Sequence, residues 1–181
     1  MQQELFPNEI RFDRQWAMPS RETYTIKPIA DLLNEEMNDL LWIDPFAGNS
    51  SLANVTNDLN PDTEAMYHKD ALEFLGMFSD KCVSGGVLYD PPYSVRQVAE
   101  CYKQYGLQVT QETTRADFWT RIKAEIARVV APGGKAISFG WNSGGIGKML
   151  NFRIKRILLV PHGGIHNDTI CTVEVKRLDK T

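Results

Sequence analysis

Short apolar runs alternate with helical segments along this chain, and the alternation predicts an α/β fold with a mostly parallel sheet. Three of the runs end in an acid followed by a turn, a pattern typical of strands that carry a ligand site at their carboxyl ends. The last two runs are joined by the polar, Gly-rich segment 161–168, which predicts a C-terminal antiparallel hairpin. We therefore expect a Rossmann-like architecture with helices on both faces of the sheet.

Each element follows from the spacing of apolar residues and from the turn residues that interrupt it. The expected strands are Leu40–Ile43, Ala53–Thr56, Gly86–Tyr89, Lys135–Phe139, Ile154–Val160 and Thr169–Val175. The expected helices are Ile29–Asn38, Ala71–Phe78, Val95–Tyr105 and Ala116–Val130. The last helix has apolar residues at helical spacing and ends at Pro132-Gly133-Gly134.

The composition is that of one globular domain over residues 1–181, with 43% hydrophobic and 24% charged residues. Apolar runs stay shorter than the roughly 18 residues of a membrane span, and no signal peptide opens the chain, so we expect a cytoplasmic protein. Cys82, Cys101 and Cys171 form no CxxC pair, which favours reduced thiols over a disulfide frame or a zinc site.

Charge is distributed unevenly along the chain. The net charge of −3 argues against binding of nucleic acid through bulk electrostatics alone. Residues 1–95 carry 6 basic and 16 acidic side chains, whereas residues 96–181 carry 14 and 7. The second half could therefore face phosphates, or the asymmetry could disappear when the chain folds. One basic cluster could contact phosphates or could blunt a solvated strand edge. Its members are Lys148, Arg153, Lys155 and Arg156.

The acids that close three strands should line one cleft, because ligands bind beyond the carboxyl ends of parallel strands. This brings Asp44, Asp58 and Asp90 together. In the turn that starts at Asp44, Gly48 lets the backbone approach a ligand closely. The acidic opening suits a ligand with an ammonium group, and the phosphate-binding GxGxxG and P-loop motifs are absent.

Two of these turns resemble motifs of one enzyme family. Asp44-Pro45-Phe46-Ala47-Gly48-Asn49-Ser50 resembles the S-adenosylmethionine (SAM) binding motif of amino-methylating DNA methyltransferases. Asp90-Pro91-Pro92-Tyr93 is similar to their catalytic tetrapeptide, in the form typical of N6-adenine enzymes. The resemblance implies a SAM-dependent class I methyltransferase fold, as in small stand-alone enzymes of phages. It extends to Asp70-Ala71, which looks like the pair that contacts the SAM adenine, and to Thr25-Ile26-Lys27-Pro28.

The resemblance also implies roles for the tetrapeptide. An aromatic amine becomes nucleophilic when hydrogen-bond acceptors draw its protons, and Asp90 and the carbonyl of Pro91 are the implied acceptors. Pro92 restricts the turn, and Tyr93 offers a ring on which an extruded adenine can stack. Transfer is then direct and in line, without a covalent enzyme intermediate.

Some assignments stay open at the sequence level. Asp58 occupies the place of the acid that binds the SAM ribose, but only 14 positions separate it from Asp44, so Asn57 or Asp62 could take that role. His162, His166 and Asp168 are residue types that bind metals, yet a polar hairpin loop that faces the cleft explains them, and we expect no metal.

Function also has alternatives. The nearest alternative is an RNA methyltransferase that acts on adenine or guanine. A protein glutamine methyltransferase fits less well, because that group usually starts its tetrapeptide with Asn. An alternative from another class is a catalytically silent subunit that binds SAM or nucleic acid. The order of motifs suggests no separate target-recognition domain. We therefore expect DNA as the partner, with recognition that is weak or supplied by a second subunit or a homodimer.

Overall fold

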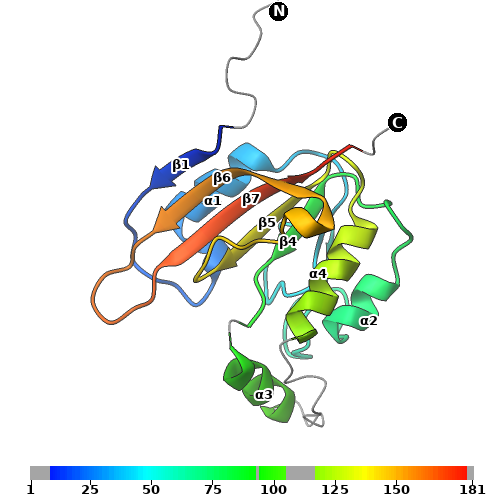
Figure 1. Ribbon diagram of the computed structural model, residues 1–181. Helices are drawn as coiled ribbons and strands as arrows, with labels where there is room; N and C mark the ends of the chain where they lie inside the picture. The colour runs from blue at the N-terminus through cyan, green and yellow to red at the C-terminus, as the bar shows by residue number, and fades with distance from the viewer. Residues whose placement is uncertain (1–8, 93, 105–116, 179–181) are drawn as a thin grey trace, which may run out of the picture.

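The computed structural model describes residues 9–92, 94–104 and 117–178, and these form a seven-stranded sheet in the order β1-β6-β7-β5-β4-β2-β3 (Figure 1). The strands are β1 Arg11–Arg14, β2 Trp42–Asp44, β3 Val55–Thr56, β4 Gly86–Tyr89, β5 Lys135–Gly140, β6 Phe152–Val160 and β7 Thr169–Lys176. Strand β7 runs antiparallel to β5 and β6, and the other pairs are parallel. The predicted Rossmann-like α/β architecture is confirmed.

Helices cover both faces of the sheet. Helix α1 (Lys27–Glu36) packs on one face, α2 (Ala71–Gly76) and α4 (Asp117–Val129) pack on the other, and α3 (Val95–Gln104) projects below the carboxyl end of β4 (Figure 1). Two short 3-10 helices are η1 (Thr23–Thr25) and η2 (Lys148–Leu150). In α4 the buried positions recur at helical spacing, which is why this segment forms a helix on the sheet. They are Phe118, Ile122, Ile126 and Val129.

The sheet separates two apolar cores because neighbouring residues of a strand point to opposite faces. In β4, Val87 belongs to the core under α2 and α4, whereas Leu88 belongs to the core under α1. Trp42 fills the second core and is 1% exposed. In the part of the chain described, no helix is long and apolar enough to span a membrane.

Strand β1 was not predicted, because it is only four residues long and three of them are charged. It pairs in parallel with β6, so β6 is not the solvated edge that the basic cluster suggested. Arg156 is buried with a side chain 8% exposed, and it donates to Asp13 at 2.8 Å and to Glu35 at 2.6 Å. This member of the cluster therefore joins β1 and α1 to the sheet.

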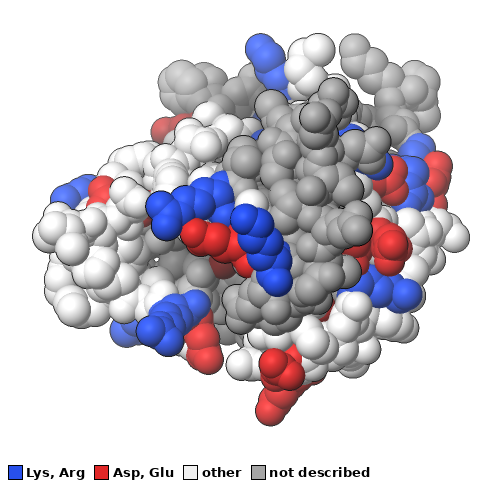
Figure 2. Space-filling view, turned by 90° about the horizontal axis from the view of Figure 1, so that it is seen from below, with Lys and Arg blue, Asp and Glu red and all other residues white. Residues whose placement is uncertain are grey.

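Charges of both signs are visible on the face that carries α3. Figure 2 shows the molecule from the side of α3, and on that face the visible Lys and Arg side chains are interspersed with Asp and Glu. On α3 itself, Arg96 forms an exposed ion pair with Glu100 at 2.7 Å. On the described part of this surface, basic and acidic side chains therefore lie side by side.

Candidate active site

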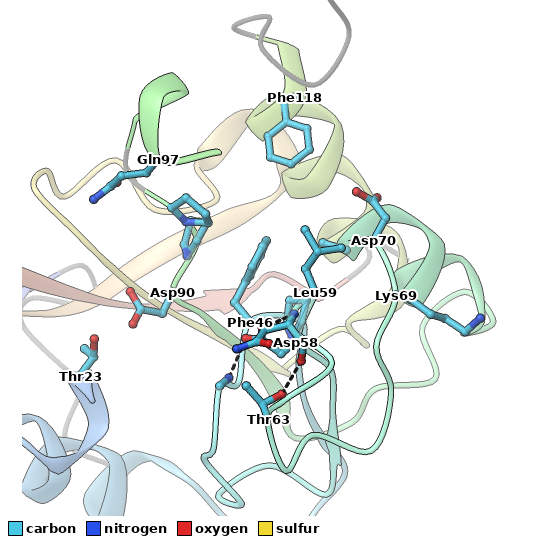
Figure 3. A pocket seen from close by; sticks show the side chains of 16 residues that line it. Thr23, Phe46, Asp58, Leu59, Thr63, Lys69, Asp70, Asp90, Gln97 and Phe118 are labelled. Atoms are coloured by element: carbon cyan, nitrogen blue, oxygen red, sulfur yellow. Dashed lines mark hydrogen bonds between the residues drawn. The ribbon is translucent and has the colours of Figure 1, made fainter. Parts of the chain in front are cut away.

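A cavity of about 450 Å³ opens at the carboxyl edge of the sheet, within the size range of small-molecule sites (Figure 3). The prediction that three strand-end acids line one cleft holds for Asp58 and Asp90, which both line this cavity. Asp44 does not line it, although both of the other acids act electrostatically on it. In Figure 3, Asp90 and Thr23 lie on one side, opposite Asp70. Phe46, Asp58 and Leu59 lie between the two sides.

The turn after β2 is built around Asp44, which is fully buried. Its carboxylate accepts the backbone N–H of Phe46 at 2.9 Å and the hydroxyl of Tyr24 at 2.9 Å. Gly48 has φ 55°, a left-handed conformation that favours glycine, and its N–H donates to Asp58 at 2.8 Å. Asp44 therefore shapes the turn from beneath, whereas Pro45, Phe46 and Gly48 line the cavity.

Burial raises the pKa of Asp44 to about 8. The hydrogen bonds from Phe46 and Tyr24 oppose the rise, and the negative charges of Asp90 and Asp58 add to it. Asp44 is consequently protonated over much of the neutral range. Because a protonated Asp44 carries no charge, the negative charge of the site comes from the acids that line the cavity, Asp58, Asp70 and Asp90.

Replacing Asp44 by asparagine is expected to remove a pH dependence of stability. An unfolded aspartate titrates at about 3.9, well below the folded value of about 8. The folded state holds the proton more tightly, so the stability due to this group is present at low pH and is lost as pH rises from about 4 to about 8. The amide that replaces the carboxyl would keep an acceptor for the Phe46 N–H and carry no titrating proton.

Urea unfolding of the parent and of Asp44→Asn at several pH values between about 5 and 8 measures this effect. Other titrating groups cancel in the difference between the two proteins. The free energy of unfolding of the variant should increase relative to that of the parent as pH rises, by at most about 1.4 kcal/mol per pH unit. A difference that stays constant across this range would mean that Asp44 is ionised in the fold.

The ribose candidates are separated by the structure. Asp58 lines the cavity, and its two oxygens accept the N–H groups of Gly48 and Asn60, each at 2.8 Å. Asn57 is fully buried, and its side chain bonds the backbone of Pro45 and Lys69. Asp62 is exposed and outside the lining of the cavity. Of the three candidates, Asp58 alone faces the space where a ligand fits.

The predicted pair Asp70-Ala71 lies on the opposite wall from Asp90. Asp70 caps α2, because its carboxylate accepts the N–H of Leu72 at 2.9 Å. Ala71 is buried and lines the cavity beside it. The cap orients the Asp70 side chain at the start of the helix and keeps this wall of the site in place.

A second cavity of about 390 Å³ adjoins the first and shares Thr23, Phe46, Gly48, Asp58 and Asp90 with it. The rest of the predicted turn lies here. Ala47, Asn49 and Ser50 line this second cavity, together with the segment 21–25 that includes η1. The turn therefore borders a continuous site on two sides.

The tetrapeptide Asp90-Pro91-Pro92-Tyr93 follows β4 directly. Asp90, Pro91 and Pro92 all line the first cavity, and Tyr93 lies outside the described residues. The indole N–H of Trp119 on α4 donates to the carbonyl of Pro92 at 3.0 Å. This contact ties the turn to the helix that packs under it, so the direction of the Pro-Pro segment depends on α4.

Several lining residues were not predicted from the sequence. Thr23, Gln97 and Phe118 come from three different elements, and Thr63 comes from the loop after β3. Leu59, in contrast, lies between the ribose candidates Asn57 and Asp62, in a segment that the sequence already indicated. The other positions carry no local pattern that distinguishes them from ordinary core or surface residues.

His162 has a structural role at the base of the hairpin loop. It is 6% exposed, and its ring nitrogens bond the carbonyl of Ala17 at 2.8 Å and the hydroxyl of Thr169 at 2.9 Å. Within the described residues, no group of three or more His, Cys, Asp or Glu side chains is arranged to hold a metal ion. His162 thus joins the N-terminal segment to the start of β7.

Comparison with solved structures identifies the fold. TrmN from Thermus thermophilus superposes with a TM-score of 0.52 at 14% identity, over 83% of this chain and 49% of that one. TrmN has the same fold. This confirms the expected Rossmann-like architecture, and the chain spans about half the length of TrmN. Neither a known family profile nor a curated protein matches the sequence.

Two further structures show weaker likeness. HI0767 from Haemophilus influenzae, described as a methylase, has a TM-score of 0.49 at 10% identity, over 84% of this chain and 88% of that one. SMU.1697c from Streptococcus mutans, described as a methyltransferase and solved in complex with SAH, has a TM-score of 0.47 at 13% identity, over 87% and 99%. At these identities, likeness concerns the fold alone.

Proposed function

We propose that this chain transfers a methyl group from SAM to the N6 amine of adenine in DNA. The observation that carries the proposal is the placement of Asp90, Pro91 and Pro92 on the wall of the same cavity as Asp58 and Asp70. A donor held by the turn after β2 would then lie next to the acceptor groups of the tetrapeptide. Such proximity is what direct transfer between two substrates requires.

The cavity suits SAM in size and in charge. Among the described residues that line it, the acids are Asp58, Asp70 and Asp90, and the single basic side chain is that of Lys69. This negative excess favours a ligand that carries an ammonium and a sulfonium. Phe46, Leu59 and Phe118 supply apolar surface for an adenine ring, and Asp58 can accept hydrogen bonds from ribose hydroxyls.

The chemistry assigned to the chain is electrostatic. SAM supplies an electrophilic methyl group, and the departing sulfur takes the electron pair of the broken C–S bond. Asp90 and the carbonyl of Pro91 accept hydrogen bonds from the target amine, which directs its lone pair toward the methyl carbon. The amine gains a C–N bond and loses a proton to an acceptor or to water. No covalent bond to the protein is needed.

We further propose that residues 1–181 act as one methyltransferase domain, with target recognition that is weak or supplied by a partner subunit. Incubating the purified chain with labelled SAM and DNA, RNA or protein, followed by nucleoside mass spectrometry, tests the proposal. N6-methyladenine in DNA is the expected product. If product were found only in RNA or on glutamine, the proposed substrate would be wrong and that acceptor would take its place. No product on any acceptor would favour a silent subunit.

Asp58→Ala is expected to weaken SAM binding about 10- to 100-fold, because it removes charge-assisted hydrogen bonds to the ribose and the support of the Gly48 N–H. Calorimetry with SAM measures the loss. Asp62→Ala is the matched control, since Asp62 lies in the same loop, is exposed and does not line the cavity. Equal affinity of Asp58→Ala and the parent would move the ribose contact elsewhere.

A further inference from the structure

The β6–β7 loop, residues 161–168, projects beyond the level of the catalytic turn. In the sheet register Tyr89 pairs with Ser138, so Asp90 is level with Phe139, which pairs with Cys171, and Cys171 pairs with Leu158. Strand β6 continues for two residues past Leu158, to Val160, which adds about 7 Å. The loop therefore starts beyond Asp90 and extends further out, as Figure 1 also shows for the hairpin between β6 and β7.

The loop is also close to Asp90 across the sheet. Strand β7 is two strands from β4 and β6 is three, which corresponds to about 10 and 14 Å at the usual strand spacing. Both strand ends that carry the loop lie at the carboxyl edge where Asp90 lies. A duplex that presents a base to this edge would therefore meet the loop within a few base pairs of the target.

The base of the loop is firmly held while its tip is exposed. The ring of His162 bonds Ala17 and Thr169, and the N–H of Ala17 donates to the carbonyl of Pro161 at 3.2 Å. At the tip, Ile165 is 98% exposed. It follows Gly163 and Gly164, which have φ of 70° and 60°. These left-handed glycines make a tight turn that presents Ile165 outward.

Single exposed apolar side chains are ordinary on protein surfaces. Here Ile165 is not the single exposed apolar side chain of the region. In the N-terminal segment that bonds the base of the loop, Trp16 is 58% exposed and Met18 is 67% exposed. A Cβ on Gly163 would lie 3.5 Å from the indole nitrogen of Trp16, so this ring lies against the loop. In Figure 2 the left-hand part of the molecule, where Figure 1 places the β6–β7 loop, is mostly uncharged.

We propose that the β6–β7 loop is a wedge that inserts Ile165 between base pairs of a duplex and stabilises extrusion of the target adenine. The inference rests on the proposed function. Apolar side chains on rigid supports unstack base steps in duplexes, and an enzyme that acts on a base must take it out of the stack. Trp16 provides an aromatic surface beside the opened step.

The test compares duplex and single-stranded oligonucleotides of one adenine-containing sequence as methyl acceptors. Ile165→Ala is expected to lose about tenfold or more in methylation of the duplex and to stay within about twofold of the parent on the single strand, which needs no extrusion. In a duplex with 2-aminopurine at the target, we expect the parent to raise the fluorescence and Ile165→Ala to raise it less, by a similar factor. Ile165→Phe should retain duplex activity, because it keeps an apolar wedge.

Met149→Ala is the matched control. Met149 is 91% exposed and lies in η2, which precedes β6 and so sits at the opposite edge of the sheet. It should match the parent on both substrates. Parent-like activity of Ile165→Ala on the duplex, or equal losses on both substrates, would overturn the wedge. A loss accompanied by a change in sedimentation would assign Ile165 to a contact between copies and would also overturn it. If the parent methylated neither the duplex nor the single-stranded oligonucleotide, the proposed function itself would be wrong.

Discussion

Replacing Asp90 by alanine is expected to reduce methyl transfer at least about 100-fold, the loss seen when one preorganised electrostatic contact is removed. The variant loses the carboxylate that would accept a hydrogen bond from the target amine. Its fold should persist, because Asp90 is only partly buried and lies on the cavity wall, outside both apolar cores. Initial rates of N6-methyladenine formation on adenine-containing DNA measure the effect.

Two measurements make this result specific. SAM binding by calorimetry should remain within a few-fold of the parent, since Asp58 and Asp70 stay in place. Asp90→Asn keeps one acceptor oxygen without the charge, so its rate should fall between those of the parent and Asp90→Ala. Methylation by Asp90→Ala at the parent rate would refute the catalytic assignment, whatever the substrate.

Trp42→Ala is expected to lower the free energy of unfolding by about 3–5 kcal/mol, the usual cost of emptying a buried aromatic site. Trp42 is 1% exposed, and its indole N–H donates to Asn38 at 3.0 Å. The ring lies against Gly86, where an added Cβ would be 2.7 Å from it. Without the indole, the backbone between β2 and β4 would border an empty space.

Urea unfolding followed by circular dichroism gives the loss for Trp42→Ala. Met149→Ala is the control, because its side chain is 91% exposed and its removal should change stability by less than about 0.5 kcal/mol. A loss below about 1 kcal/mol for Trp42→Ala would show that the core under α1 closes around the vacant site.

Elements with strong local signals were predicted well. The strand Gly86–Tyr89 has the predicted bounds, because its apolar run ends at two prolines that cannot continue the hydrogen-bond ladder. The strand predicted at Leu40–Ile43 instead spans Trp42–Asp44, and Leu40 is 50% exposed. Here the N–H of Trp42 bonds the side chain of Asn54, a partner 12 positions away that no local pattern reveals.

The site was predicted less completely than the fold. The motifs predicted that the turn after β2 and the tetrapeptide after β4 belong to the site, and residues of both line the two adjoining cavities. They did not separate Asp44, which faces the interior, from Asp58, which faces the cavity. That difference depends on where Tyr24 and Gly48 place their donors. Wall residues such as Phe118 were missed because they enter the site only through packing.

The sequence by itself determined the alternation of strands and helices, the antiparallel C-terminal pair and the two turns that resemble methyltransferase motifs. These features depend on apolar periodicity, on Gly and Pro, and on residues adjacent in the chain. Only the tertiary structure decided that β1 pairs with β6 at the edge of the sheet, that Arg156 is buried in ion pairs, and that the loop bearing Ile165 extends beyond the level of Asp90. Each of these depends on contacts between residues far apart in the sequence, whose geometry is set by how the whole sheet assembles.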